Sequence, residues 1–198
     1  MRGTPDQYLQ IEETGNIKHE YIDGQSYAMA GASDAHVTIA GNLFALLRSH
    51  VRGSNCRVYI SDMKARIEAL NRFYYPDVMV SCDSRDLATP NYKRFPTLII
   101  EVLSDSAESF GCGFASPKPF QETEAFDRGD KFVDYQQIEN LREYVLISTK
   151  QQRVDCLQRT EQGLWLFQSY NKQCSSFRLD SVGFDVQLEL LYEDVLLR

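Results

Sequence analysis

The alternation of apolar and polar residues divides the chain into a series of expected helices and strands. Near the start, Thr4 or Asp6 can cap a short amphipathic helix, which Gly15 ends. The following stretch, KHEYIDGQSYAM, predicts a β-hairpin, because Asp23 and Gly24 form one of the strongest two-residue turn signals. The chain is therefore expected to open with one helix and one hairpin.

A longer helix is expected next. Ser33 can cap it, and Gly53 follows its end. Its apolar residues recur at alternating steps of three and four, which predicts one apolar stripe facing the core. The stripe consists of Val37, Ala40, Phe44, Leu47 and Val51.

Strand-like segments occupy the middle of the chain and most of its last third. The middle group is CRVYIS, MKARIEAL, RFYYPDVMVS and PTLIIEVL, and the last of these is apolar on both faces, as expected of a central strand covered on both sides. FDRGDKFVDYQQIEN predicts a helix that Asp127 can cap. Four further strands are expected at REYVLIS, RVDCLQR, LWLFQSY and SSFRLD. A small terminal helix is expected at LELLYEDVLL.

This order of elements predicts an α/β fold. We expect a mixed central β-sheet flanked by helices, with an N-terminal hairpin and antiparallel C-terminal strands. A length of 198 residues is compatible with a single domain over residues 1–198.

Composition adds limits on location and partners. The chain has no apolar run of the roughly 20 residues that a membrane span needs and no apolar leader, so we expect a cytoplasmic protein. Its net charge of −7 would repel nucleic acid unless a basic surface exists. Residues 35–61 lack Asp and Glu and contain Arg48, Arg52 and Arg57 beside His50. Such a segment fits a nucleic-acid contact or, equally, a helix end whose cations complement the helix dipole.

The five cysteines give no sign of a disulfide framework or a zinc site. Their number is odd, they are widely spaced, and no CxxC pair is present. We therefore expect reduced thiols that serve mainly to fill space in the structure.

Two acidic residues stand out by their surroundings. Asp77 follows Pro76 inside a run of strand-forming residues, and proline suits only a strand edge, start or bulge. A turn residue at a strand end is the alternative for Asp77. Glu101 shares one strand face with Ile99 and Leu103. A charge in such an apolar run costs several kcal/mol unless it is paired or binds a cation, so the alternatives for Glu101 are a buried salt bridge and a catalytic role.

The order of these motifs resembles a known family. PD, an apolar strand ending in EVL, DRGDK opening a helix, and EYVLIS follow one another as in the Uma-type putative restriction endonuclease family of the PD-(D/E)XK nuclease superfamily. The resemblance also includes HEYIDGQSYAMAG and HVTIAGNL, and covers roughly residues 4–160. It implies a restriction endonuclease-like fold and a metal-dependent endonuclease that hydrolyses DNA phosphodiester bonds. It further implies Mg²⁺ or Mn²⁺ as cofactor, DNA as partner and a homodimer.

The same resemblance assigns site residues. Asp77, Glu101 and Lys131 are the implied catalytic residues, and Glu20, Asp77 and Glu101 the implied metal ligands. Leu103 occupies the position where the superfamily has its lysine, two residues after the acidic one. Lys131, in the following helix, is the candidate for a lysine that has moved to another element.

The sequence allows more than one role for several residues near the expected site. Taken alone, Lys131 could be a solvated helix lysine paired with Asp127 four residues earlier. His36 matches a family position but is more often a capping or core residue, so it is not included in the expected site. Asp62 could lie near the site or in a turn.

The sequence departs from the family pattern between Glu101 and Lys131. A segment at about residues 111–126 is not expected and has the character of an inserted loop. A catalytically impaired nucleic-acid-binding or regulatory module of the same fold is therefore an alternative function. A protein without nuclease activity, in which Glu101 pairs with Lys64, Arg66 or Lys131, is another.

Overall fold

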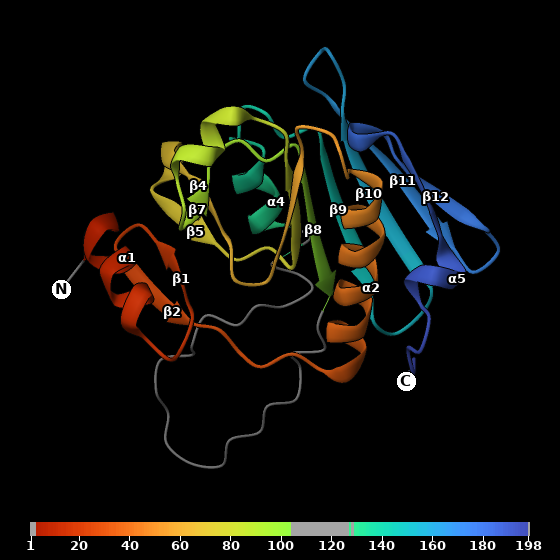
Figure 1. Cartoon of the computed structure of the whole chain (residues 1–198), viewed down its shortest axis with the longest axis horizontal. Coiled ribbons are helices and arrows are strands. Elements are labelled where there is room, and N and C mark those ends of the chain that lie inside the picture. Colours follow the sequence, from red (N-terminus) through yellow and green to blue (C-terminus); the bar gives the residue numbers. More distant parts are fainter. Residues whose placement is uncertain (1–2, 104–126, 128, 198) are drawn as a thin grey trace.

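The computed structural model describes residues 3–103, 127 and 129–197. The expected elements occur in the expected order along the chain (Figure 1), and two short strands, Tyr92–Lys93 and Phe184–Gln187, are present in addition. The helices are α1 (Pro5–Thr14), α2 (Asp34–His50), α4 (Asp130–Tyr135) and α5 (Leu188–Leu191). The strands are β1 (His19–Ile22), β2 (Gln25–Ala28), β3 (Arg57–Ile60), β4 (Lys64–Ile67), β5 (Arg72–Tyr74), β6 (Val78–Ser81), β7 (Tyr92–Lys93), β8 (Leu98–Leu103), β9 (Glu143–Ser148), β10 (Arg153–Arg159), β11 (Trp165–Asn171), β12 (Ser176–Leu179) and β13 (Phe184–Gln187).

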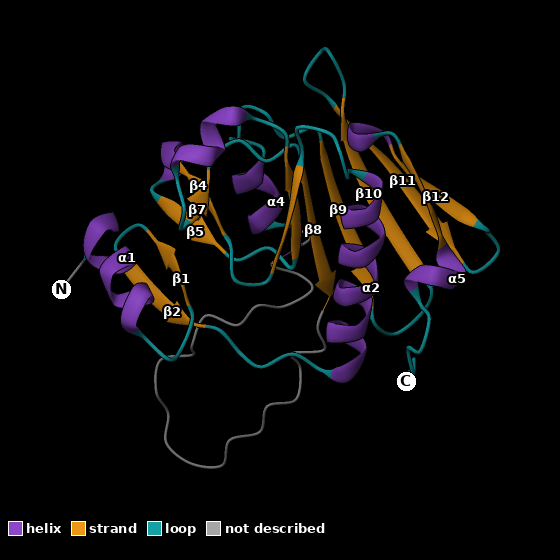
Figure 2. Ribbon diagram, in the orientation of Figure 1, coloured by secondary structure: helices purple, strands orange, loops and turns teal. Residues whose placement is uncertain are grey.

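The strands form two large sheets and one small one (Figure 2). The six-stranded sheet has the order β11-β10-β9-β8-β6-β3, in which β8 and β9 are parallel and the other pairs are antiparallel. The five-stranded sheet has the order β2-β1-β5-β4-β7, and β12 pairs with β13. The predicted mixed α/β fold, with its N-terminal hairpin and antiparallel C-terminal strands, is confirmed.

The core has two main layers on either side of the six-stranded sheet. On one face, α2, α5 and the β12–β13 pair cover the sheet through residues such as Leu43, Leu47 and Phe177. On the other face, α4 and the five-stranded sheet pack against it through Tyr135 and Tyr74. The outer face of the five-stranded sheet is covered by α1 (Figure 1). The six-stranded sheet is therefore covered on both faces, which explains its apolar central strands.

Local signals place the first elements correctly. Thr4 and Gln7 form a capping box at the start of α1, and Ser33 caps α2. Asp23 and Gly24 adopt positive φ angles of 46° and 92°, as the tight turn between β1 and β2 requires.

The expected apolar stripe of α2 is only partly right. Val37 is 60% exposed, whereas Ile39 and Leu43 are fully buried with Leu47. These three residues follow one another at steps of four and form the ridge that packs on the sheet. Val37 lies in the first turn of α2, and the buried stretch of the helix begins only at Ile39.

The segment RFYYPDVMVS was expected as one strand and is two. β5 belongs to the five-stranded sheet and β6 to the six-stranded sheet, and Pro76 lies between them. Proline cannot donate to a strand ladder, so the pairing stops there and the chain passes from one sheet to the other. Asp77 therefore lies directly before β6, next to a proline at a strand start, which is one of the positions that Pro76 allowed.

The helix α4 differs from its prediction at its start. Gly129 is its N-cap and no side chain caps it, so Asp127 does not have the capping role expected for it. The inserted segment expected at about residues 111–126 lies outside the described residues. No helix in the described ranges is long and apolar enough to cross a membrane.

The expectation of reduced cysteines is wrong for one pair. Cys56 and Cys82 form a disulfide, with their Cα atoms 3.9 Å apart. The register of β3 with β6 pairs Arg57 with Ser81, so the next residues outward lie opposite each other. This neighbourhood depends on strand pairing, which the 26-residue separation in sequence does not reveal. Cys156 is buried and Cys174 partly exposed, and both are free thiols.

Candidate active site

Glu101 lies near the end of the central strand β8, on the face that α4 and the five-stranded sheet cover. Strand β8 pairs with β6 on one side and β9 on the other, so all six of its residues are buried. Glu101 is 3% exposed, and its same-face neighbours Ile99 and Leu103 belong to the apolar layer beneath α4. A carboxylate in this position needs a partner from another element.

The ammonium of Lys131 is that partner. Its Nζ atom lies 3.5 Å from Glu101 Oε1, 3.1 Å from Glu20 Oε1 and 3.3 Å from Asp127 Oδ1. Lys131 is 2% exposed, so it is not a solvated helix lysine, although its pairing with Asp127 is present. The structure thus brings Glu20, Glu101 and Lys131 together from β1, β8 and α4. Leu103 remains in the apolar layer.

The short helix α4 is held in place by a second ion pair. Asp134 accepts hydrogen bonds from the guanidinium of Arg72 and the phenol of Tyr74, both on β5. Tyr135, on the same helix, packs edge-on against Tyr74. These contacts fix the helix against the five-stranded sheet and so fix the height of Lys131 between the two sheets.

Phenol groups complete the surroundings of the buried charges. Tyr135 donates a hydrogen bond to Glu101 Oε1 over 3.0 Å, and Tyr144 donates to the backbone carbonyl of Asp127 over 2.9 Å. Burial raises the pKa of both phenols well above the usual value, and the nearby Glu101 carboxylate raises it further. Both therefore stay protonated and remain hydrogen-bond donors.

The acidity of Glu101 is strongly shifted. Burial raises its pKa well above the ordinary value, and the ammonium of Lys131 opposes this shift. Asp127, Asp77 and Glu20 raise the pKa further, because each adds negative charge near the same carboxyl group. A strongly perturbed carboxyl group with a specific charged partner is typical of functional sites.

Asp77 lies next to Glu101, directly before the neighbouring strand β6. The β6–β8 register pairs Val78 with Ile100, and one further step sets Asp77 opposite Glu101. Asp77 Oδ2 accepts a hydrogen bond from the backbone N–H of Val102 over 2.6 Å, and Oδ1 lies 2.7 Å from His36 Nε2. The side chains of Asp77 and His36 are 18% and 12% exposed. They are therefore more accessible than the buried group around Lys131.

His36 and Asp127 belong to this group of contacts, although the expected site did not include them. The sequence favours a capping or core role for His36, but the side chain contacts Asp77. Asp127 was assigned a capping role and instead contacts Lys131. For His36 a signal existed, because the Ser33 cap places it in the first turn of α2. For Asp127 only the spacing of four to Lys131 pointed to a contact.

The donor chemistry fits a hard divalent cation. Glu20, Asp77 and Glu101 offer carboxylate oxygens, which Mg²⁺ and Mn²⁺ prefer. Across the ranges that the structure describes, no three His, Cys, Asp or Glu side chains form a ready metal-binding group. Glu20 and Glu101 instead meet at the ammonium of Lys131. A positive charge therefore already lies among these carboxylates.

Other candidates from the sequence lie elsewhere. Asp62 is an exposed residue that pairs with Lys18. Lys64 lies over the ring of Tyr75, 5.0 Å from its centroid, and Arg66 lies 3.7 Å from Glu68. Of the three cations considered as partners of Glu101, Lys131 is the one that contacts it.

The basic segment of α2 does not adjoin the site. His50, in the last turn, hydrogen-bonds the carbonyl of Val182 over 2.9 Å and stacks on Phe184. His36 and Asp77 are at the opposite end of α2, roughly 21 Å away at about 1.5 Å per residue. This placement favours the helix-end explanation for the cations over a nucleic-acid contact at the site.

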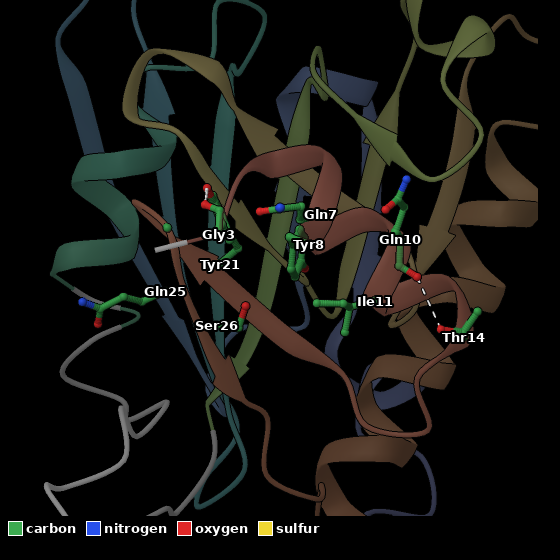
Figure 3. A pocket seen from close by; sticks show the side chains of 10 residues that line it. Gly3, Gln7, Tyr8, Gln10, Ile11, Thr14, Tyr21, Gln25 and Ser26 are labelled. Atoms are coloured by element: carbon green, nitrogen blue, oxygen red, sulfur yellow. Dashed lines mark hydrogen bonds between the residues drawn. The ribbon is translucent and has the colours of Figure 1, made fainter. Parts of the chain in front are cut away.

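A cavity of about 770 Å³ lies between α1 and the β1–β2 hairpin (Figure 3). Its lining has no charged residue and includes Gln7, Tyr8, Tyr21 and Gln25. Tyr21 belongs to the apolar group under α1, whereas its neighbour Glu20 contacts Lys131. Because successive strand residues point to opposite faces, the cavity and the carboxylate site are on opposite faces of the five-stranded sheet.

Comparison with known proteins identifies relatives over almost the whole chain. A model of the Uma2 family, described as a putative restriction endonuclease, matches residues 5–111 and 120–190. Uncharacterized protein slr1290 of Synechocystis sp. (strain ATCC 27184 / PCC 6803 / Kazusa) is 35% identical over 189 residues, covering 96% of this chain and 90% of that protein. Uncharacterized protein sll1609 of the same organism is 34% identical over 169 residues, covering 82% and 84%.

One solved structure shares the fold. The crystal structure of a putative nuclease belonging to DUF820 from Anabaena variabilis ATCC 29413 superposes with a TM-score of 0.72. The match covers 98% of this chain and 99% of that one at 15% sequence identity. The restriction endonuclease-like fold expected from the resemblance is confirmed.

Proposed function

Because the chain belongs to the Uma2 family of putative restriction endonucleases, we propose that it is a metal-dependent endonuclease that hydrolyses DNA phosphodiester bonds. The observation that carries this proposal is the meeting of Lys131 with Glu20 and Glu101, each from a different element, between the two sheets. Carboxylates that can hold a divalent cation and an ammonium that can stabilise developing negative charge are groups that metal-assisted hydrolysis of a phosphodiester can use.

The residues have separate roles in this proposal. Glu101 and Asp77 would hold Mg²⁺ or Mn²⁺, and Glu20 would complete the set of ligands. When bound, the cation supplies positive charge that makes a water molecule a stronger nucleophile. Lys131 holds that water or the scissile phosphate in position and stabilises negative charge as it develops.

Two further residues position the carboxylates. Tyr135 donates to Glu101 Oε1 and so restricts the rotation of that side chain. His36 and the backbone N–H of Val102 hold the two oxygens of Asp77. Because Asp77 and His36 are the more exposed members of the group, we propose that DNA approaches from their side.

The proposed substrate also suggests an assembly. Cutting both strands of a duplex needs two sites, so the working form in this proposal is a homodimer with one site in each copy. The homodimer is an expectation of the family resemblance.

Near-complete burial of the central residues favours one competing function. Glu20 and Lys131 are 1% and 2% exposed, so a phosphate group cannot reach them in this arrangement. A protein that kept this arrangement without opening it would bind nucleic acid without cutting it. The two functions differ in whether cleavage occurs at all.

The test compares DNA cleavage by the wild-type chain and by Glu101→Gln. We expect the wild type to cut DNA with Mn²⁺ and not with a chelator, and Glu101→Gln to be slower by about 10²–10³-fold. Glu143→Gln is the matched control, because Glu143 is also a buried glutamate, 1% exposed, on the neighbouring strand β9.

The results of this test distinguish a nuclease from a nucleic-acid-binding module without activity. Binding of DNA by the wild type without Mn²⁺-dependent cleavage would support the impaired module. Unchanged cleavage by Glu101→Gln would remove Glu101 from the mechanism. Equal losses in Glu101→Gln and Glu143→Gln would indicate a general effect on the fold.

A further inference from the structure

Strand β11 forms one end of the six-stranded sheet. It pairs with β10 over seven residues, Trp165 to Asn171, and no other described strand pairs with its outer edge. The sequence of the strand, WLFQSYN, contains no charged residue, no proline and no glycine. Exposed sheet edges usually carry charges, prolines or bulges that prevent pairing with another chain. This edge lacks the first two.

The same edge carries exposed apolar side chains. Leu164 is 67% exposed, Leu166 55% and Phe167 57%. They are nearly consecutive, at the start of β11 and just before it. Because successive strand residues alternate, Leu166 and Phe167 lie on opposite faces of the sheet, so exposed apolar side chains flank the unpaired edge on both faces, where another protein chain can cover them.

The other ends of the two large sheets differ from β11. Strand β7 is two residues long and ends in Lys93, and β3 carries the exposed Arg57. Strand β2 is uncharged but has only four residues. Among these four described ends, β11 alone combines length, neutrality and exposed apolar residues.

We propose that two copies of this chain pair through β11, antiparallel and about a two-fold axis, so that one sheet continues through both copies. An antiparallel edge is self-complementary about such an axis, so no second surface is needed. The net charge of −7 disfavours contact between charged surfaces of two copies, whereas β11 brings no like charges together.

The midpoint of β11 sets the simplest register. If the two-fold axis passes at Gln168, then Phe167 pairs with Ser169 of the second copy, and Leu166 with Tyr170. All seven residues are then paired, over about 23 Å of strand. The proposed function expects a homodimer, and β11 is the surface through which its two copies would meet. The contact can form whether or not the chain cuts DNA.

The first test is the molar mass in solution. Size-exclusion chromatography with light scattering should give twice the chain mass for the wild type. Phe167→Lys removes an apolar side chain and places two lysines on diagonal positions of the paired edge, within reach of each other, so that variant should run as a monomer. Ile17→Lys is the control, because Ile17 is 59% exposed and lies outside β11. It should remain a dimer. A monomeric wild type at every concentration, or a dimeric Phe167→Lys, would overturn the proposal.

The second test probes the register without disturbing the apolar residues. In a Cys174→Ser background, Gln168→Cys should form a disulfide between the two copies on mild oxidation, and Ile17→Cys should not. Failure of Gln168→Cys to cross-link, with a wild type that is dimeric, would place the contact elsewhere. Both readouts are independent of cleavage, so a failed dimer and a failed nuclease are told apart by mass and by the Glu101→Gln comparison.

Discussion

Two carboxylates, Glu101 and Asp86, are equally buried but have different surroundings. They are 3% and 1% exposed. Asp86 accepts hydrogen bonds from the backbone N–H groups of Arg94 and Phe95, over 2.8 and 3.2 Å, and from the Ser81 hydroxyl over 2.6 Å. Glu101 instead has one phenol, one ammonium and further carboxylates around it.

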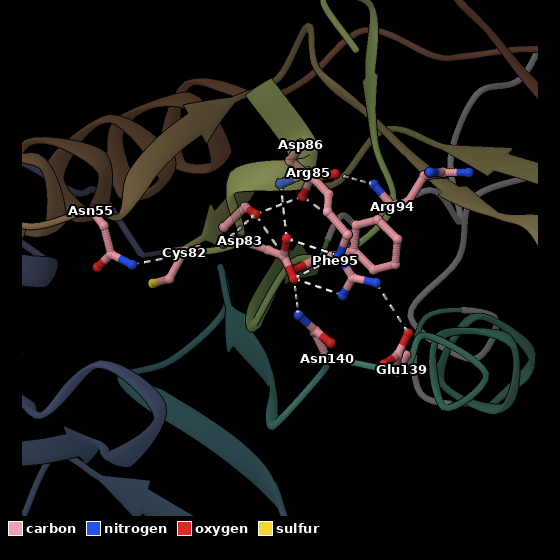
Figure 4. Close-up of polar contacts among 10 residues, drawn as sticks. Asn55, Cys82, Asp83, Arg85, Asp86, Arg94, Phe95, Glu139 and Asn140 are labelled. Carbon is pink, nitrogen blue, oxygen red and sulfur yellow. Dashed lines mark hydrogen bonds and ion pairs between the residues drawn. The ribbon is translucent and has the colours of Figure 1, made fainter. Parts of the chain in front are cut away.

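Figure 4 shows the turn network to which Asp86 belongs. Next to it, Asp83 accepts hydrogen bonds from Arg85 and from Asn140, and these bonds hold its pKa well below the usual range. Asp83 and Asp86 thus hold their loop in place through neutral donors and an exposed ion pair, and no cluster of carboxylates is needed. The group around Lys131 gathers several carboxylates, which costs stability that a purely structural role does not require. In the proposed function, this difference distinguishes Glu101, the acid with a chemical role, from Asp86, which holds a loop.

The strongest test of this contrast removes the shared ammonium. Lys131→Met leaves Glu20, Glu101 and Asp127 without the cation between them, and the free energy of unfolding should fall by about 3–5 kcal/mol. Denaturant unfolding of the metal-free chain measures it. Lys93→Met is the matched control, because Lys93 is a buried lysine that donates to backbone carbonyls of Asp86 and Thr89. Equal losses in both variants would mean that the carboxylates around Lys131 are not special.

A smaller loss of stability is expected when Asp86, the second buried carboxylate, is replaced. Asp86→Ala leaves the N–H groups of Arg94 and Phe95 without their acceptor, which should lower the free energy of unfolding by about 2–3 kcal/mol. Mn²⁺-dependent cleavage, measured where the variant is fully folded, should stay within a few-fold of wild type. A large loss of cleavage would remove the distinction between the two buried acids.

The smallest effect concerns pH. Burial raises the pKa of Glu143, against hydrogen bonds from Ser181 that lower it. The folded state therefore keeps this proton at a pH where the unfolded chain has lost it, so stability falls as pH rises from about 4.3 towards the raised value. Glu143→Gln should flatten this slope by at most about 1.4 kcal/mol per pH unit. Thermal unfolding of both proteins across this range measures it, and parallel curves would contradict the expectation.

Local chemistry made the first elements predictable. The Thr4 and Ser33 caps and the Asp23–Gly24 turn depend on neighbours within three residues, so the sequence alone locates them. The burial of Glu101 also followed from the period of two along its strand.

Features that depend on pairing between distant segments were not predictable in the same way. The passage of the chain between two sheets at Pro76 and the disulfide of Cys56 with Cys82 both depend on strand order. The residues alone left the partner of Glu101 open among Lys64, Arg66 and Lys131, and the family resemblance favoured Lys131. The added contact with Glu20 required the five-stranded sheet to lie over α4.

The two histidine contacts of α2 limit how its length can change during evolution. His36 contacts Asp77 in the first turn, and His50 contacts the Val182 carbonyl in the last. One residue gained or lost between them would rotate one end against the other by about 100°, because a turn has about 3.6 residues. Either Asp77 or Val182 would then lose its histidine. Insertions and deletions between these two histidines should therefore be rare among relatives, whereas substitutions on the exposed face of α2 should be common.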